Sequence, residues 1–127
     1  MERPAERDPL TERVIGLAID VHRTLGPGLL ESAYEECLCA ELEDAGFTHA
    51  RQVPLPIVYK GRRLDCGYRL DVVVERALIL EIKSVEQLLP IHDAQILTYL
   101  RLSRHRVGLL INFNAALLKN GIKRFVL

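Results

Sequence analysis

The segment 70-LDVVVERALILEIKSV-85 contains two apolar runs separated by a short polar turn, a pattern that predicts two neighbouring strands. Residues i and i+2 of a strand point to the same face, so Glu81 and Lys83 share one face of the second run. Leu80 and Ile82 share the other face. A charge is costly to bury unless it is paired or binds an ion. The acid and the base inside this run therefore indicate either a structural ion pair or an active site.

The first apolar run of the stretch also contains an acid, Asp71. The two runs are close enough in sequence to form a β-hairpin. A turn centred on Arg76 would place Asp71 opposite Glu81, and it would also place Arg69 opposite Lys83. Shifting the register by one residue would move one acid to the other face of the hairpin. We therefore predict an odd-length loop, since only that loop brings both acids to one face.

Two helices are predicted before this hairpin. Asp8 and Pro9 are typical of a helix start, with an N-cap followed by proline at the first helical position. The turn 26-GPG-28 ends the first helix, and Gly46 is suited to end the second. Apolar residues recur at helical spacing in both segments. The first helix has Val14, Ala18, Val21, His22 and Leu25, and the predicted buried face of the second has Leu30, Tyr34, Cys37, Leu38, Leu42 and Ala45.

After the second helix the pattern changes to that of strands. We predict a strand over 52–61, at an edge or bulged because of its prolines. Residues 62–75 predict one long bent strand or two short ones, broken near Gly67. The remaining elements are a helix over 91–102 and strands over 77–85, 106–113 and 122–127. The order α-α-β-β-β-α-β-β predicts an α/β fold of the α+β kind, with a central mixed sheet flanked by helices.

Length and composition indicate one domain over residues 1–127, with a flexible arm at 1–8. The charged first residues are not followed by an apolar segment, and no apolar run is long enough to span a bilayer. We therefore expect neither a signal peptide nor a membrane partner. The cysteines form no CxxC pair, which argues against a disulfide framework or a zinc site. We expect Cys37, Cys39 and Cys66 to be reduced thiols in a cytoplasmic protein.

Charge is distributed unevenly along a chain whose formal net charge is zero. Residues 94–127 contain six basic and no acidic side chains, whereas residues 1–93 contain 11 basic and 17 acidic ones. This asymmetry predicts either an ordinary solvated surface or a basic rim that contacts phosphates. The six basic residues are Arg101, Arg104, Arg106, Lys119, Lys123 and Arg124.

Asp71 and Glu81 would repel one another if both were ionised on one half-buried face. Lys83 supplies one compensating charge, and a divalent cation would supply more. Mg²⁺ prefers oxygen ligands, commonly one or two carboxylates plus waters and substrate oxygens, so both acids are candidate ligands, with the Ile82 carbonyl oxygen as a further one. Lys83 could orient the attacking water, lower its pKa or stabilise developing negative charge. The alternative is a structural salt bridge between Lys83 and one of the acids.

Polar residues on two predicted helices could complete such a site. Glu31 follows the GPG turn, where the helix dipole favours an acid, and its carboxylate could also reach a metal directly or through water. His92, Gln95 and Tyr99 form one stripe of the later helix. For His92 we favour a solvated position. Gln95 and Tyr99 flank apolar residues and could bind a phosphate, a water or Lys83.

Element order and motifs resemble those of the PD-(D/E)XK superfamily of restriction-endonuclease-like nucleases. Within it, the chain looks like the small bacterial group of GxxExxY proteins, whose naming motif stands here as Gly28-Leu29-Leu30-Glu31-Ser32-Ala33-Tyr34. The resemblance covers residues 10–127 and includes 68-YRLDVVV-74, 79-ILEIKSV-85, 93-DAQILTYL-100 and 108-GLLINFN-114. Leu70 stands before Asp71 where the superfamily name has proline, a common departure.

The resemblance implies a restriction-endonuclease-like core and assigns roles to particular residues. Asp71 and Glu81 would bind Mg²⁺, with Mn²⁺ as a substitute, and Lys83 would serve the attacking water. The remaining roles belong to residues on helices. Glu31 would be the acid on the first helix of the superfamily core. Gln95 would be the polar residue on the second helix of that core, with Tyr99 beside it.

Three functional hypotheses follow. The first is a Mg²⁺-dependent phosphodiesterase that hydrolyses DNA or RNA. The second is a non-catalytic module of nuclease fold that binds nucleic acid or a protein partner, suggested by the small size of the chain. The third is hydrolysis of a small phosphorylated metabolite at the same site. Because cutting both strands of a duplex needs two sites, we expect a homodimer, with candidate faces at 29–45 and 122–127.

Overall fold

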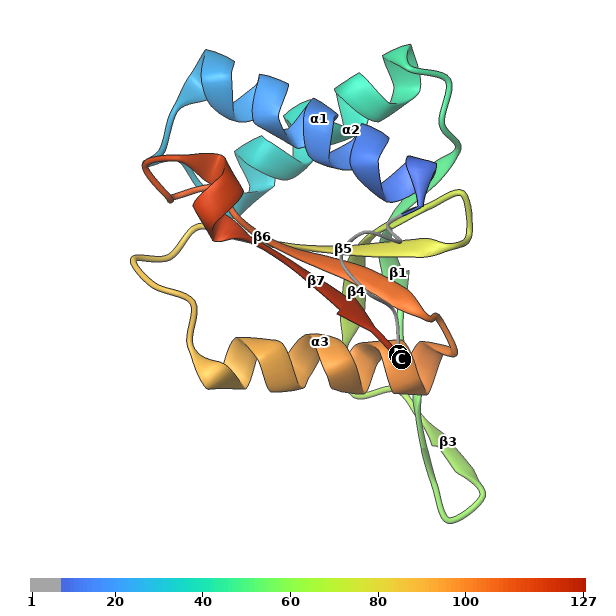
Figure 1. The fold of residues 1–127 in the computed structure, drawn as a ribbon. Helices are drawn as coiled ribbons and strands as arrows, with labels where there is room; N and C mark the ends of the chain where they lie inside the picture. The colour runs from blue at the N-terminus through green and yellow to red at the C-terminus, as the bar shows by residue number, and fades with distance from the viewer. Residues whose placement is uncertain (1–7) are drawn as a thin grey trace.

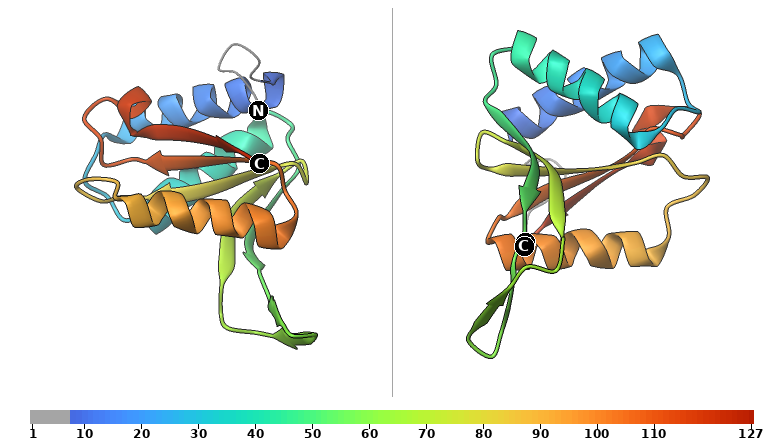
Figure 2. Two further views of the ribbon diagram at one scale, coloured as in Figure 1. Left: turned by 60° about the horizontal axis from the view of Figure 1, so that its bottom comes forward. Right: turned by 180° about the vertical axis from the view of Figure 1, so that it is seen from behind.

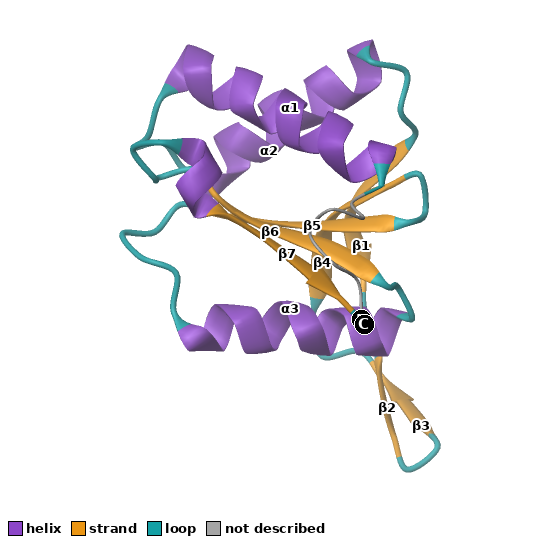
Figure 3. Ribbon diagram, viewed as in Figure 1, coloured by secondary structure: helices purple, strands orange, loops and turns teal. Residues whose placement is uncertain are grey.

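The chain forms three layers, in which a sheet lies between helices (Figure 1). The computed structural model describes residues 8–127. Helices α1 (Pro9–Leu25) and α2 (Glu31–Asp44) lie on one side of the sheet, and α3 (Pro90–Ser103) lies on the other. The strands, coloured by element type in Figure 3, are β1 (His49–Pro54), β2 (Ile57–Tyr59), β3 (Arg62–Leu64), β4 (Arg69–Val74), β5 (Leu78–Lys83), β6 (Val107–Asn112) and β7 (Ile122–Val126). A short 3-10 helix, Leu118–Gly121, precedes β7.

The central sheet has five strands and mixed direction. Its order is β1-β4-β5-β6-β7, while β2 and β3 form a separate two-stranded sheet. β5 and β6 run parallel and are joined by α3 as a crossover helix, and the other neighbours pair antiparallel. The predicted fold class, a mixed sheet flanked by helices, is confirmed.

Alternating side chains of the central strands build a core on each face of the sheet. Leu78, Leu80 and Ile82 of β5 pack with side chains of α1 and α2, including Leu38. Ile79 packs on the opposite face, in the cluster that contains Leu100 of α3. A polar side chain at an odd-numbered position of β5 is thus directed toward the α3 side.

The helices begin and end largely where the sequence indicates. Asp8 caps α1, because its Oδ1 accepts a hydrogen bond from the Thr11 N–H at 2.8 Å, and Pro9 is the first helical residue. Gly46, with a φ of 83°, follows the C-cap of α2. Apart from Asp8, the predicted arm at 1–8 lies outside the described residues. No helix within residues 8–127 is both long and apolar enough to cross a membrane.

The prediction of one strand over 52–61 is wrong. β1 begins earlier, at His49, and ends at Pro54, and β2 starts separately at Ile57. Pro54 and Pro56 carry no backbone N–H, so a continuous ladder cannot run through this segment. This division adds one strand to the predicted order, and the division of residues 62–75 into β3 and β4 adds a second.

The hairpin of β2 and β3 projects from the body of the molecule (Figure 2). Lys60 and Gly61 between its strands have φ values of 48° and 78°, the left-handed conformations of a tight hairpin turn. Residues 62–75 divide into β3 and β4, which is the two-strand alternative of the prediction.

Candidate active site

The hairpin of β4 and β5 has the predicted register. Its antiparallel pairs are Val72–Leu80, Val73–Ile79 and Val74–Leu78. These pairs centre on Arg76, so the odd-length turn is confirmed. The ladder ends at Val72–Leu80, and the expected pairing of Arg69 with Lys83 does not form. Arg69 pairs instead with Pro54 of β1.

Beyond the last ladder pair, two acidic side chains occupy the gap between the strands. The Ile82 N–H donates to Asp71 Oδ2 at 2.8 Å, and the Asp71 N–H donates to Glu81 Oε1 at 3.4 Å. Each carboxylate is therefore held by the backbone of the opposite strand. The register brings the two acids together, and the interrupted ladder leaves room for both.

A bend in β1 and β4 lies at the same point. Gln52 has a φ of 50°, and the flanking pairs of β1 and β4 place it across from Asp71. In a regular strand residues i and i+2 share a face. Here Leu70 packs on the α3 side and Val72 on the side of α1 and α2. Asp71 therefore lies at a break in the alternation, between the two helical layers.

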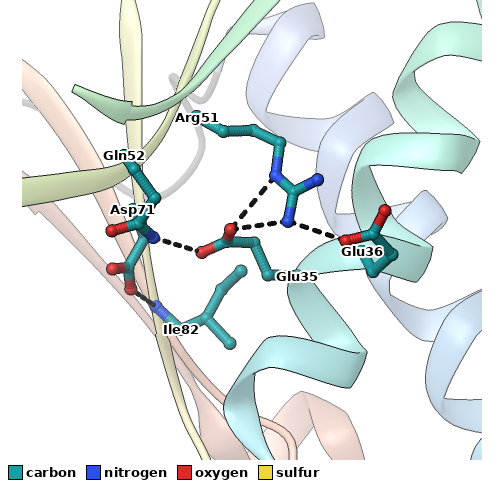
Figure 4. A network of polar contacts seen from close by, with 6 residues as sticks. All are labelled: Glu35, Glu36, Arg51, Gln52, Asp71 and Ile82. Atoms are coloured by element: carbon teal, nitrogen blue, oxygen red, sulfur yellow. Dashed lines mark hydrogen bonds and ion pairs between the residues drawn. The ribbon is translucent and has the colours of Figure 1, made fainter.

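Glu35 of α2 is a residue of this site that the sequence analysis missed (Figure 4). It is 7% exposed, and its Oε1 accepts a hydrogen bond from the Gln52 side-chain amide at 2.8 Å. Arg51 donates to its Oε2 from Nε at 3.1 Å and from a terminal guanidinium nitrogen at 2.9 Å, and also reaches Glu36 at 2.9 Å. A buried acid thus links α2 to the bend beside Asp71.

The sequence does carry a signal for Glu35. It precedes Leu38 by three positions and Leu42 by seven, and both leucines are fully buried. Positions i, i+3 and i+7 share one face of a helix. Helical spacing therefore places an acid on the buried face of α2, although it does not reveal which partners neutralise it.

Burial raises the pKa values of both paired acids. The pKa of Glu81, which is 4% exposed, is raised to about 8, first by burial and then by the charge of Asp71. Burial also raises the pKa of Asp71; the hydrogen bond from Ile82 opposes this increase and the charge of Glu35 adds to it. Lys83 lowers both pKa values without cancelling the effect of burial. Without a cation, the raised pKa values therefore favour one proton held by the pair of acids at neutral pH.

Lys83 does not form the structural salt bridge that the sequence left open. Its ammonium group makes no ion pair and no hydrogen bond with any residue of 8–127. It is half-buried at the end of β5 and lines a cleft of about 750 Å³ beside α3. A base inside an apolar strand is therefore not explained by pairing within the described structure.

The stripe of polar residues on α3 faces the same cleft. Gln95 and Tyr99 line it together with Lys83, and the Gln95 side-chain amide donates to the Tyr99 hydroxyl at 3.0 Å. The pKa of Tyr99 is raised, first by burial and then by the charge of Glu81, which reflects its position near the acids. His92, expected in a solvated position, is partly exposed in the cleft, and its Nδ1 accepts a hydrogen bond from the Leu89 N–H at 2.9 Å and so caps α3.

Glu31 lies beside the end of β5 rather than with the paired acids. Its Oε2 accepts a hydrogen bond from the N–H of Ser84, the residue that follows Lys83, at 3.2 Å. The Ser84 hydroxyl donates in turn to the Leu29 carbonyl at 2.6 Å. Glu31 thus ties the start of α2 to the strand end that presents Lys83. Leu30, predicted on the buried face of α2, is 77% exposed because it is the N-cap residue.

The tyrosine of the Gly28–Tyr34 motif also has a structural position. Its hydroxyl donates to the Gly26 carbonyl at 2.6 Å and accepts from the Leu29 N–H at 3.1 Å. Its ring stacks on Phe113, with 4.5 Å between the centroids. Gly28 has a φ of 102°, a conformation that L side chains rarely adopt. The motif therefore closes the turn before α2 and fixes the place from which Glu31 reaches β5.

The basic residues of 94–127 do not form one surface at this site, so of the two alternatives the ordinary solvated surface fits better. Arg104 and Arg106 lie just before β6, beside the start of β5, whereas Lys83 ends β5. At about 3.3 Å per residue, the length of β5 separates them by about 16 Å. Two other members are paired with distant acids: Lys123 with Asp93 at 3.2 Å and Arg124 with Asp8 at 3.4 Å. The uneven distribution of charge along the sequence therefore does not produce a basic surface around the site.

The comparison with known families agrees with this geometry. The family model of the PD-(D/E)XK nuclease superfamily matches residues 8–125. The chain belongs to this superfamily. The matched range runs from the N-cap of α1 into β7, and so includes both acids, Lys83 and the cleft. No curated protein and no solved structure matches the chain. The GxxExxY grouping stays a prediction.

PD-(D/E)XK nucleases generally use divalent metal ions, and the donors of this site fit one. Asp71 and Glu81 present carboxylate oxygens at the interrupted ladder. The carbonyl and N–H groups of Ile82 lie on the same edge of β5, and the N–H donates a hydrogen bond to Asp71. The carbonyl oxygen is therefore also directed toward β4. Two carboxylates and a carbonyl suit a hard cation that retains water ligands. Among residues 8–127 no three His, Cys, Asp or Glu side chains form a metal-binding group, so Glu31 does not join the two acids directly.

Proposed function

We propose that this protein is a Mg²⁺-dependent nuclease that hydrolyses phosphodiester bonds of DNA or RNA, with Mn²⁺ able to replace Mg²⁺. The observation that carries the proposal is the pair of acids at the interrupted β4–β5 ladder, next to a lysine without an ion pair among the described residues. Membership of the nuclease superfamily supports this chemistry. In this proposal the substrate would lie in the cleft that Lys83, Gln95 and Tyr99 line.

In this proposal Asp71, Glu81 and the Ile82 carbonyl oxygen would hold the metal ion. The ion would supply Lewis-acid activation of the phosphate and would lower the pKa of the attacking water. Binding of a cation there would displace the proton that the pair of acids otherwise holds. Lys83 places a positive charge where negative charge develops on the phosphate, and it needs no rearrangement because no acid sequesters it.

The helices would support this arrangement in two ways. Gln95 and Tyr99 lie along the cleft, where their amide and hydroxyl groups can bind the phosphate or orient the water. Glu31 would act as a positioning residue, because it fixes Ser84 and hence the end of β5 that carries Lys83.

A cleavage assay tests the proposal, using labelled single-stranded and duplex DNA and RNA in Mg²⁺, Mn²⁺ or EDTA. Asp71→Asn and Lys83→Ala should each abolish metal-dependent cleavage while the circular dichroism spectrum stays that of the wild type. Lys119→Ala is the matched control, because Lys119 is exposed and lies outside the cleft. Normal cleavage by Lys83→Ala would show that the proposed mechanism is wrong.

The other two hypotheses correspond to distinct outcomes of this assay. Binding of nucleic acid without cleavage in any metal would indicate the non-catalytic module. If mononucleotides inhibit cleavage as strongly as oligonucleotides do, the result would indicate a small phosphorylated substrate. We also propose a cytoplasmic setting, which the three free cysteines support.

A homodimer is part of the same proposal. β7 is the last strand in the order of the central sheet, so its outer edge offers backbone groups for pairing with a second copy. Sedimentation velocity over a range of protein concentrations would reveal the association. A sedimentation coefficient that stays at the monomer value would contradict it.

A further inference from the structure

The cleft that Lys83 lines also has apolar walls. Besides Lys83 and the polar residues of α3, its walls include Ile57, Tyr68, Ile91 and Leu102. Several of these are open to solvent: Ile91 is 67% exposed and Tyr68 is 45% exposed. A substrate that offered only phosphates and sugars would leave this apolar surface without a partner. The lining instead suits flat, weakly polar groups such as nucleobases.

Tyr68 has the properties of a stacking platform. It lies in the loop between β3 and β4, and its ring contacts Tyr99 edge to face, with 6.1 Å between the centroids. That contact holds one edge of the ring while the side chain remains partly open to the cleft. An aromatic ring fixed in this way can stack on any base, since every base has a π-face.

The segment that forms the outer wall of the cleft is basic. Residues 55–69 contain four basic side chains and one acidic one, in a chain whose formal net charge is zero. The basic residues are Lys60, Arg62, Arg63 and Arg69. Three of them lie on the projecting β2–β3 hairpin, whose residues from Val58 to Leu64 are all exposed (Figure 2). Such a hairpin has no packing role in the core, and its charge complements a phosphate backbone.

We propose that the nuclease acts on single-stranded nucleic acid, with a base stacked on Tyr68 in the apolar cleft and the adjoining backbone held along the β2–β3 hairpin. This rests on the proposed function and names its substrate class. In a duplex the faces of the bases are covered by stacking and only their edges are exposed in the grooves, so a paired base cannot stack on Tyr68. An unpaired strand offers both its base faces and its phosphates, which match the two parts of this surface.

The geometry also fits a strand that extends beyond the reacting phosphate. Ile57 lines the cleft and begins β2, and the hairpin turn at Lys60 follows three residues later. At about 3.3 Å per residue, the hairpin charges lie about 10 Å beyond the cleft wall. A strand leaving Lys83 along the cleft would meet Tyr68 and then these cations.

Fluorescence anisotropy with labelled oligonucleotides in EDTA tests the proposal without cleavage. The probes are one sequence as single-stranded DNA, the same sequence as RNA, and a blunt duplex of equal length. We expect both single strands to bind more tightly than the duplex, and the DNA and RNA arms show which sugar is preferred. Duplex binding that equals or exceeds single-strand binding would overturn the proposal.

Two variants locate the binding surface. Tyr68→Ala should weaken single-strand binding about 5- to 100-fold, whereas Tyr68→Phe, which keeps the ring, should stay close to the wild type. Replacing Lys60, Arg62 and Arg63 by serine should reduce the slope of log affinity against log salt by about 2, at about 0.7 for each lost phosphate contact. Lys119→Ser is the matched control and should leave the slope unchanged. Unchanged affinity of Tyr68→Ala would exclude the stacking platform.

Cleavage by the wild type in Mg²⁺ separates this inference from the proposed function. Cleavage of duplex but not of single strands would overturn the single-strand inference and leave the nuclease proposal intact. Tyr68-dependent binding of single strands without cleavage in Mg²⁺ or Mn²⁺ would overturn the nuclease proposal and leave the binding surface in place.

Discussion

Replacing Glu81 by glutamine tests the electrostatics of the site without relying on activity. The pKa of Glu81 is about 8 in the folded protein, against an ordinary value of 4.5, mainly because the carboxyl group is buried. Because folding raises the pKa of Glu81, the folded protein binds a proton at this carboxyl more tightly than the unfolded chain does. Protonation of Glu81 therefore stabilises the native state. This contribution is complete below about pH 4.5 and is lost as the pH rises to about 8. The free energy of unfolding of the wild type should therefore fall across this window.

The size of the effect follows from proton counting. Between these pH values the folded protein binds one proton at Glu81 that the unfolded chain has already released. The free energy of unfolding then falls by about 1.4 kcal/mol per pH unit, or several kcal/mol in all. Glutamine has nearly the same shape and cannot ionise, so Glu81→Gln should lack this decline. The variant should match the wild type near pH 5 and exceed its stability above pH 8.

Urea unfolding followed by circular dichroism, in EDTA and at several pH values, measures the difference. Glu86→Gln, at an exposed position, is the control and should follow the wild type. Parallel pH profiles for the wild type and Glu81→Gln would refute the reasoning. Mg²⁺ at ten times its dissociation constant should stabilise the wild type at pH 8 by about 1.4 kcal/mol, and the variant by less.

Three further substitutions test other parts of the site. Tyr34→Phe should lower the free energy of unfolding by about 1–3 kcal/mol, because it removes the hydroxyl that closes the turn before α2; urea titration measures this, with the exposed Tyr59→Phe as control. Glu35→Ala should lower it by about 1–3 kcal/mol, because Arg51 and Gln52 lose their shared acceptor; an unchanged unfolding midpoint would contradict that. Lys83→Met should change stability by less than about 1 kcal/mol, since no ion pair is lost; a larger loss would reveal a structural role.

Much of the site was predictable because it depends on local sequence. The odd-length turn between Val74 and Leu78 sets the register of the hairpin, and this register brings Asp71 to Glu81. The start of α1 at Asp8 likewise depends on a local hydrogen bond. The superfamily motifs lie in these same short segments, which is why they could be recognised without a structure.

The sequence was a weaker guide where distant segments meet. The predicted bounds of β1 were wrong because this strand pairs with β4, which lies beyond the intervening β2–β3 hairpin in the chain. The left-handed conformation of Gln52 also breaks the side-chain alternation on which a strand prediction relies. Glu35 was overlooked because its partners, Arg51 and Gln52, come from that same strand. The basic residues of the last third were grouped by position in the chain, although ion pairs and strand direction disperse them in space.

Local sequence was enough to establish the hairpin register, the two neighbouring acids and the lysine beside them, since side-chain alternation and turn length act over a few residues. The tertiary fold sets the surroundings of these groups. It ended the β4–β5 ladder at the acids, left Lys83 without an ion pair among the described residues, and set a basic hairpin beside an apolar cleft. These features depend on burial and on contacts between segments far apart in the chain, which no local pattern records.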